Sequence, residues 1–369
     1  MTATGPRTAP DVVEVVDVVA LGESMVTFLP SRPGPLADVP SFDRGIGGAE
    51  SNVACALAAA GHSARWISRV GDDGFGDHLV ETIGGYGVDV SHVRRDPARP
   101  TGIYFRTAGD RSTDAHEVAY YRAGSAASAM SPSGVDLDAV RAARVLHLSG
   151  ITPALSADCL DLMRVLTAPH PDRPLISFDV NHRPALWCDG HGPEVLLELA
   201  RGADIVFVGD DEARQAWGLH GARAVRDALP EPEIVVVKQG KGGAVAFDKA
   251  TDGLPCDDVD GTATFVRALD VDVVAAVGAG DAFAAGFLSA TLRGLPVRDR
   301  LRHGHLTAAA ALTVPGDLAP PPARAHADRL AALDDTAWGR LRLGPGWTQA
   351  EEPEEPEEHQ GPEKEARTP

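Results

Sequence analysis

Apolar residues along the chain fall into short continuous runs, and a longer segment with helical spacing follows most of these runs. The runs are rich in Val, Leu and Ile and do not alternate with polar residues, which is typical of parallel strands buried on both faces. Helices cover both faces of such a sheet. The pattern therefore predicts an α/β fold, a three-layer α/β/α sandwich with a mainly parallel central sheet. The expected strands are residues 15–23, 64–71, 143–150, 174–181, 203–209 and 233–240, and the expected helices include residues 52–62, 193–202 and 281–294.

Two segments break this alternation. Residues 24–46 contain four prolines among scattered apolar residues, and residues 97–125 have the pattern of two strands joined by a polar turn. Ligands of open α/β sheets collect at the carboxyl ends of the strands. We expect these two segments to form a small β-sheet lid over a site at that edge.

The two ends of the chain differ from its body. Residues 349–369 contain eight glutamates and almost no apolar residues, so burial cannot offset the entropy lost on ordering them. We expect a disordered N-terminal segment over residues 1–13, one domain over residues 14–345 and a disordered acidic tail over residues 346–369. The net charge of −19, with no basic patch in the sequence, argues against binding to nucleic acid or to an anionic membrane.

Cysteine usage indicates a reduced protein. The four cysteines are widely spaced, without a Cys-x-x-Cys pair or a histidine cluster at zinc spacing. The first residues lack the apolar core of a signal peptide, and no apolar run approaches the roughly 18 residues that a membrane helix needs. These features predict a cytoplasmic protein.

The most informative motif is the sequence Gly278-Ala279-Gly280-Asp281 directly before an expected helix. Glycines at a helix start leave backbone N–H groups free at the positive end of the helix dipole, where phosphate oxygens bind. A carboxylate in the first turn is placed to accept a proton from an attacking hydroxyl. The alternative is an ordinary helix cap, which a Gly-Asp step also provides.

Two further glycine motifs are weaker taken singly. Gly47 and Gly48 precede the helix that contains Asn52, in a second turn between a strand and a helix. Residues 238–243, with the sequence KQGKGG, follow a strand and would let a nucleotide approach the backbone, although a tight hairpin turn explains them equally well. No G-x-x-x-x-G-K-[ST] motif is present, which excludes a Walker-type nucleotidase.

Recognition of charge in this chain must rest on arginine, because it has only four lysines and 30 arginines. The planar guanidinium group suits carboxylates. Arg106, Arg122 and Arg183 lie beside expected strand ends, and Tyr104 and Tyr120 lie near the first two. Surface arginines beside core tyrosines remain the alternative interpretation.

Four motifs in this order and spacing resemble the PfkB, or ribokinase-type, carbohydrate kinase family: GGAESNVA (47–54), RVGDDGFG (69–76), VKQGKGGA (237–244) and VGAGDAF (277–283). The resemblance extends from about residue 12 to about residue 325. Four further segments resemble one group within the family, the 2-keto-3-deoxygluconate kinases. They are PTGIYFR (100–106), YYRAGSA (120–126), HLSGITPALS (147–156) and FDVNHRPALW (178–187). The resemblance implies a ribokinase-like fold and transfer of the γ-phosphoryl group of MgATP to the terminal hydroxyl of that sugar acid.

The resemblance also implies a role for individual residues. Asp281 would be the base, and Gly278, Ala279 and Gly280 would form the anion hole. ATP would lie against Lys238, Gly240, Gly243 and His305, and Glu212 would organise Mg²⁺ through water. The residues expected to hold the sugar acid are Gly48, Asn52, Tyr104, Tyr120, Arg122, Ile151 and Arg183.

The chain departs from the family pattern near the nucleotide. Ala275 stands where relatives have Asp, Gly209 stands where they often have Asn, and His305 replaces another family Asn. We therefore expect no dependable activation by potassium. Members of the family commonly associate through the lid or the outer helices, so the resemblance allows a homo-oligomer.

Two alternatives stay open. The same machinery could phosphorylate another sugar, such as fructose, ribose or 2-keto-3-deoxygalactonate. The chain could also be a catalytically silent sugar-binding protein on a kinase scaffold, although such a protein has no need of a base at Asp281.

Overall fold

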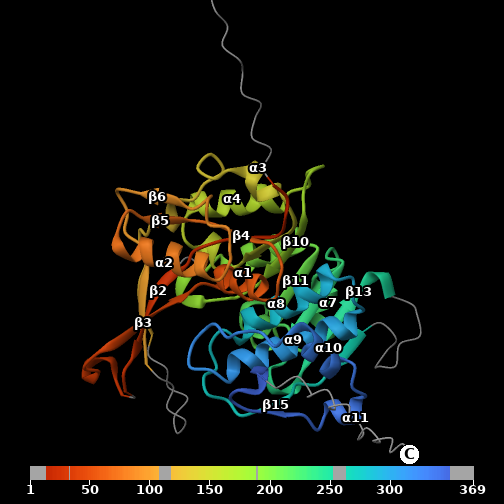
Figure 1. Ribbon diagram of the computed structural model, residues 1–369. Helices are drawn as coiled ribbons and strands as arrows, with labels where there is room; N and C mark the ends of the chain where they lie inside the picture. The colour runs from red at the N-terminus through yellow and green to blue at the C-terminus, as the bar shows by residue number, and fades with distance from the viewer. Residues whose placement is uncertain (1–13, 33, 108–117, 188–189, 252–262, 350–369) are drawn as a thin grey trace, which may run out of the picture.

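The computed structural model describes residues 14–32, 34–107, 118–187, 190–251 and 263–349. Figure 1 shows a layered body with a smaller sheet projecting from one side. The expected N-terminal segment lies outside the described residues, as do residues 350–369 of the expected tail and residues 108–117 of the expected lid. We expected the tail to begin at residue 346, but residues 347–349 form the 3-10 helix Trp347–Gln349.

The central sheet has eight strands in the order β14-β13-β12-β11-β10-β9-β1-β4. The six strands from β12 to β4 run parallel, and β13 and β14 are added antiparallel at one edge. The mainly parallel sheet is thus confirmed. The strands are β1 (Val16–Leu21), β4 (Ala64–Ile67), β9 (Ala143–Ser149), β10 (Leu175–Asp179), β11 (Ile205–Gly209), β12 (Ile234–Lys238), β13 (Ala244–Asp248) and β14 (Ala263–Val266).

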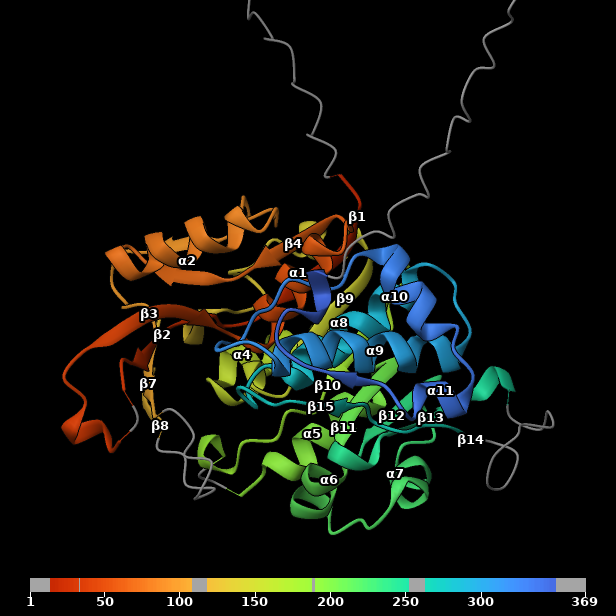
Figure 2. The same ribbon diagram turned by 60° about the horizontal axis from the view of Figure 1, so that its bottom comes forward.

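Helices cover both faces of the sheet, as Figure 2 shows for α8 and α9 on one side and α5, α6 and α7 on the other. Alternate strand residues explain the two layers. Phe207 packs with Phe287 of α8 in one core, whereas its neighbour Val206 packs in the other core with Leu196 of α5. The helices are α1 (Ala49–Ala59), α2 (Gly74–Gly85), α3 (Leu137–Arg141), α4 (Ala157–Thr167), α5 (Gly192–Arg201), α6 (Asp210–Trp217), α7 (Ala222–Ala228), α8 (Ala279–Leu292), α9 (Val297–Leu312), α10 (Arg324–Ala331) and α11 (Asp335–Trp338).

One expected strand, residues 64–71, is wrong as a single element. Its first part is β4, but pairing with β1 ends at Ile67. The chain then leaves the sheet, and β5 (Arg69–Gly71) pairs with β6 (Arg94–Asp96), where Arg69 and Asp96 form an ion pair of 2.9 Å.

The projecting sheet has the order β3-β2-β7-β8 and confirms the small β-sheet expected from the two irregular segments. Aromatic stacking supports it, since the rings of Phe28 and Phe105 lie 4.7 Å apart between centroids. Its strands are β2 (Met25–Pro30), β3 (Phe42–Gly47), β7 (Ile103–Arg106) and β8 (Val118–Tyr121). A separate pair, β15 (Asp270–Val271) and β16 (Arg342–Leu343), joins the chain before α8 to the C-terminal region.

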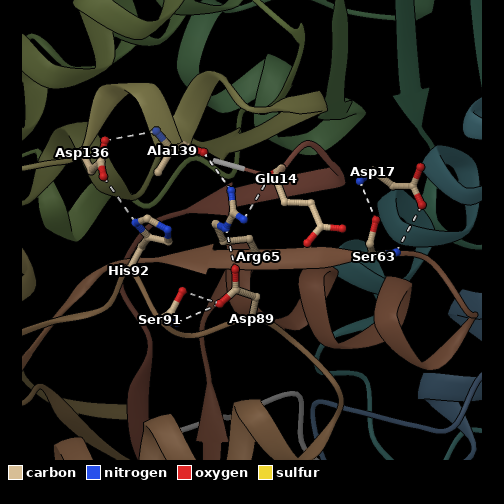
Figure 3. A network of polar contacts seen from close by, with 9 residues as sticks. All are labelled: Glu14, Asp17, Ser63, Arg65, Asp89, Ser91, His92, Asp136 and Ala139. Carbon is tan, nitrogen blue, oxygen red and sulfur yellow. Dashed lines mark hydrogen bonds and ion pairs between the residues drawn. The ribbon is translucent and has the colours of Figure 1, made fainter. Parts of the chain in front are cut away.

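The amino ends of the strands carry a polar network of their own, which Figure 3 shows around Arg65 of β4. Its guanidinium group donates to Asp89 at 2.6 Å and to the carbonyls of Ala139 and Glu14. These hydrogen bonds connect β4 with α3 and with the residues just before β1. The network therefore links these elements at the amino ends of the strands, opposite the carboxyl ends.

Cys55 and Cys159 are both buried and free of disulfides. In the described part of the chain, no helix is both long and apolar enough to cross a membrane.

Candidate active site

The carboxyl ends of the parallel strands bring several charged side chains together. Strand β10 ends at Asp179 and β12 ends at Lys238, while Glu212 lies in the first turn of α6 after β11. Helix α8 begins beside them and carries Asp281 in its first turn. A Cβ added to Gly280 would lie 3.6 Å from the ammonium nitrogen of Lys238, so the start of α8 faces this group directly.

The turn before α8 depends on Gly278. Its φ of +76° lies in the left-handed region, and a Cβ there would meet the carbonyl oxygen of Asp317 at 2.2 Å. A side chain is thus excluded on two grounds. The turn leaves the first amides of α8 without intrahelical acceptors, as an anion hole requires.

Asp281 is held by α1, because Asn52 Nδ2 donates to Asp281 Oδ2 at 2.8 Å. Burial raises the pKa of Asp281 to about 7, the Asn52 hydrogen bond and Lys238 lower it, and Asp179 and Asp317 raise it. A carboxyl group with a pKa near neutrality is suited to general base catalysis. Asn52, which we expected at the sugar, contacts this carboxyl group.

Lys238 forms an ion pair with Asp179, with 2.8 Å between Nζ and Oδ2. Burial alone would lower the pKa of Lys238, but Asp179 and Glu212 outweigh it and the pKa is raised. Lys238 is therefore charged and lies beside the start of α8. Asp179 had no expected role, although it lies within the motif FDVNHRPALW.

Glu212 accepts a hydrogen bond from the N–H of Gly209 at 2.8 Å, and burial raises its pKa. Arg183 approaches the same carboxylate at 3.8 Å from a side chain that is 54% exposed. Across the described residues, no group of three or more His, Cys, Asp or Glu side chains is arranged as a metal site.

The lid contributes a second group of expected residues. Tyr104 of β7 and Tyr120 of β8 have ring centroids 5.5 Å apart, and the guanidinium group of Arg122 lies 5.9 Å from the Tyr120 ring. Arg122 also forms an ion pair with Glu23, which is almost fully buried after β1. Glu23 was not foreseen, since its partner is distant in sequence.

Gly48 and Ile151 each lie just after a strand. Gly48 follows β3 of the projecting sheet, and Ile151 follows β9 of the central sheet. Gly48 precedes α1, and a Cβ on it would meet the carbonyl oxygen of Glu23 at 2.5 Å, so only glycine fits. Ile151 follows β9 and is half-buried. Its N–H donates to the hydroxyl of Ser149.

The residues expected at the nucleotide lie around the hairpin between β12 and β13. Gly240 and Gly243 have φ values of +55° and +130°, and a Cβ on Gly243 would meet the carbonyl oxygen of Val266 at 2.3 Å. His305 lies beneath this segment, where its ring contacts the Val266 carbonyl at 3.1 Å. Burial lowers the pKa of His305 to about 4, so it is a neutral packing group here.

A buried carboxyl group with a pKa near 7, a turn with free amides and a charged lysine meet at one end of a parallel sheet, an arrangement that suits phosphoryl transfer. The pattern of the pfkB family carbohydrate kinases matches residues 16–324. The chain belongs to this family of sugar kinases.

Three relatives match this chain over most of its length. The 2-dehydro-3-deoxygluconokinase of Bacillus subtilis is 35% identical over 82% of this chain and 91% of its own. The 2-dehydro-3-deoxygluconokinase of Thermoproteus tenax is 34% identical over 86% of this chain and 94% of its own. The 2-dehydro-3-deoxygalactonokinase of Haloferax volcanii is 31% identical over 82% and 93%.

Solved structures have the same fold. A PfkB protein from Polaromonas superposes with a TM-score of 0.71 at 34% identity, covering 82% of this chain and 98% of that one. A sugar kinase from Pyrococcus horikoshii in complex with ATP superposes with a TM-score of 0.72 at 25% identity, covering 88% and 100%. The expected ribokinase-like fold is thereby confirmed.

Proposed function

We propose that this protein transfers the γ-phosphoryl group of MgATP to the terminal hydroxyl of 2-keto-3-deoxygluconate (2-dehydro-3-deoxygluconate), giving 2-keto-3-deoxy-6-phosphogluconate. The observation that carries the proposal is Asp281 at the start of α8, with its pKa raised to about 7 beside the glycine turn and Lys238. Two relatives with this activity, 35% and 34% identical, support the choice of substrate.

Asp281 accepts the proton of the attacking hydroxyl. Its Oδ2 is engaged by Asn52, which leaves Oδ1 for that proton. The sugar oxygen forms a bond to the γ-phosphorus, the bond from that phosphorus to the bridging oxygen of ADP breaks, and ADP leaves. The amides of Gly278, Ala279 and Gly280 stabilise charge on the transferring group.

The nucleotide binds along the β12–β13 hairpin, where Gly240 and Gly243 let it approach the backbone. Lys238 supplies a positive charge to the phosphates. The related sugar kinase from Pyrococcus horikoshii with bound ATP supports this choice of phosphoryl donor. His305 supports this site by packing under the Val266 segment.

The residues present suit Mg²⁺, which keeps several waters and needs only one or two carboxylates besides the substrate phosphates. Glu212 would hold it through water, with Asp179 as the neighbouring carboxylate across Lys238. When bound, the ion neutralises charge on the phosphates. Glu212 keeps its own position through the N–H of Gly209.

Arginine defines the substrate class in this proposal. Arg183 is more than half exposed, and its contacts are a long hydrogen bond of 3.3 Å from Nη1 to the His182 carbonyl and the approach of Glu212 at 3.8 Å, so its guanidinium group can pair with a sugar carboxylate. Arg122 forms an ion pair with buried Glu23, so the carboxylate of Glu23 already partly neutralises its positive charge. Tyr104, Tyr120, Ile151 and Gly48 complete the sugar site.

The proposed location, domain bounds and oligomeric state are those expected from the sequence. The described cysteines are free, which is consistent with a reduced, cytoplasmic protein. We further propose that residues 14–345 form one domain and that the protein forms a homo-oligomer. The 31% identical galactonate kinase makes 2-keto-3-deoxygalactonate the alternative substrate.

Replacing Asp281 by Asn tests the mechanism. The variant keeps the shape of the side chain but removes the base, so we expect kcat to fall by about 100-fold or more with the sugar KM little changed. A coupled ADP-release assay measures both constants, and phosphorus NMR of the wild-type product shows whether the phosphate is on the terminal CH₂ group. Retained turnover in Asp281→Asn, or a phosphate on another carbon, would contradict the proposal.

A further inference from the structure

Glu50 lies in the first turn of α1 and was not part of any expected site. Its side chain is 0% exposed. Oε1 accepts hydrogen bonds from the hydroxyls of Ser149 and Thr152, each at 2.8 Å. Ser149 is the last residue of β9, and Thr152 begins the 3-10 helix Thr152–Ala154. One buried oxygen thus holds both sides of the turn that contains Ile151.

The backbone of Ile151 is connected to Glu50 through Ser149. The Ser149 hydroxyl donates to Glu50 and accepts a hydrogen bond from the N–H of Ile151 at 3.1 Å. The carbonyl of Ile151 accepts from the N–H of Ala154 at 3.1 Å, which leaves this carbonyl one lone pair. That lone pair and the half-buried side chain are what Ile151 can present to a sugar. The position of both depends on the turn that Glu50 holds.

Glu50 also shares a helix with a residue that holds Asp281. Asn52, two positions further along α1, donates the hydrogen bond to Asp281. The carboxyl group of Glu50 fits because Gly22, after β1, has no side chain: a Cβ there would lie 2.1 Å from Cδ of Glu50. Glu50 therefore connects the Ile151 turn with the helix that orients Asp281, in a space that a glycine leaves open.

Stability does not account for an acid at this position. Burial raises the pKa of Glu50, whereas the hydrogen bonds from Ser149 and Thr152 and the charge of Arg122 lower it. Among the described residues, Oε2 has no hydrogen-bond partner. A carboxyl group buried with one oxygen unpaired costs free energy that an apolar side chain would not. What the acid provides is one fixed acceptor for two hydroxyls.

We propose that Glu50 is a positioning residue, which fixes the Ile151 turn relative to α1 and thereby one side of the sugar site. This inference rests on the proposed function in one respect, the assignment of Ile151 to that site. It adds an acid that is buried behind the site rather than exposed in it. Sugar binding should therefore depend on a side chain that the sugar does not touch.

Two variants separate positioning from stability. Glu50→Gln keeps a carbonyl oxygen for the two hydroxyls, and Glu50→Ala removes it. We expect Glu50→Ala to raise the sugar KM by about tenfold and Glu50→Gln by no more than about twofold, with the ATP KM within about twofold of wild type in both. The melting temperature should fall in both, because alanine leaves two buried hydroxyls without their acceptor and glutamine buries an NH₂ group in place of the unpaired Oε2.

The control is Arg65→Met, which breaks a buried polar network at the opposite ends of the strands. It should lower the melting temperature and leave the sugar KM unchanged. A sugar KM that recovers in Glu50→Gln while the melting temperature stays low is the result expected of a positioning residue. A sugar KM in Glu50→Gln as high as in Glu50→Ala, or a sugar KM in Glu50→Ala equal to that of the control, would overturn the proposal.

A further variant tests whether Glu50 acts through Ser149. Ser149→Ala should also raise the sugar KM, and combined with Glu50→Ala it should raise it no further than the larger of the two single changes. Effects that multiply, or an unchanged sugar KM in Ser149→Ala, would contradict this connection and with it the proposal; the second outcome decides even where Glu50→Ala does not fold. All variants are assayed with the sugar that the wild-type protein turns over fastest, so failure of 2-keto-3-deoxygluconate as a substrate would leave this test intact.

Discussion

At the scale of single residues, the surroundings of Asp281 set the pKa of its carboxyl group. Asp281 is buried beside other acids, which raises its pKa, and Asn52 and Lys238 limit the increase, so that the pKa stays at about 7. The base is ionised above that pH and protonated below it. Turnover should therefore rise as the pH increases through about 7.

Asn52 gives a test of this balance. Its side chain donates to the ionised form of Asp281, so Asn52→Leu should raise the pKa of the base further and shift the acidic limb of kcat/KM to higher pH. A hydrogen bond to a charged group is worth about 1.5 kcal/mol, which predicts a shift of about one pH unit. The pH profile of kcat/KM measures it. If the limb stays where it is in the wild type, Asp281 is not the group that titrates.

At the scale of elements, the carboxyl ends and the amino ends of the central strands carry different groups of polar residues. The carboxyl ends carry Asp179, Lys238 and the start of α8, and the amino ends carry the Arg65 network. The residues expected to act in catalysis thus lie at the carboxyl ends of the strands, and we expect the Arg65 network at the amino ends to contribute to stability.

Arg65→Met should separate these roles. Arg65 is buried, whereas its partner Asp89 is about one-third exposed, so the cost of breaking the pair is less than for two buried charges. We expect the free energy of unfolding to fall by about 2 kcal/mol, measured by urea denaturation, with kcat and both KM values unchanged. An altered sugar KM with unchanged stability would show that the network reaches the active site.

Much of the fold and part of the site could be predicted from local sequence. The expected helix at 193–202 is α5 (Gly192–Arg201), because its apolar spacing and the surrounding glycines are local signals. The motif of Gly278 to Asp281 before α8 is a local signal of the same kind. Residues 64–71 were wrong as one strand, since nothing local marks the point where β4 leaves the sheet.

The residues that sequence reasoning missed owe their roles to contacts between distant parts of the chain. Glu23 meets Arg122 from the lid, and Asp317 meets Tyr104 from more than 200 positions away. Neither acid lies in a periodic or glycine-rich pattern. A single sequence shows which chemistry is present, whereas the partners of these buried acids emerge only when the fold is complete.

At the scale of the whole molecule, the fold places a carboxyl group with a pKa near 7, the Gly278 turn and the half-exposed Arg183 at the carboxyl ends of the strands. A carboxylate on the sugar gives Arg183 a partner, and a neutral sugar does not. Preference for a sugar acid is therefore the property that connects the fold, the lid and the chemistry.

The most direct measurement is a coupled ADP-release assay of the purified protein with MgATP, comparing 2-keto-3-deoxygluconate, fructose, ribose and gluconate. We predict that kcat/KM for 2-keto-3-deoxygluconate exceeds that for fructose and ribose by at least about tenfold, and that Arg183→Gln removes most of this preference. Faster turnover of fructose or ribose, or an unchanged preference in Arg183→Gln, would contradict the account.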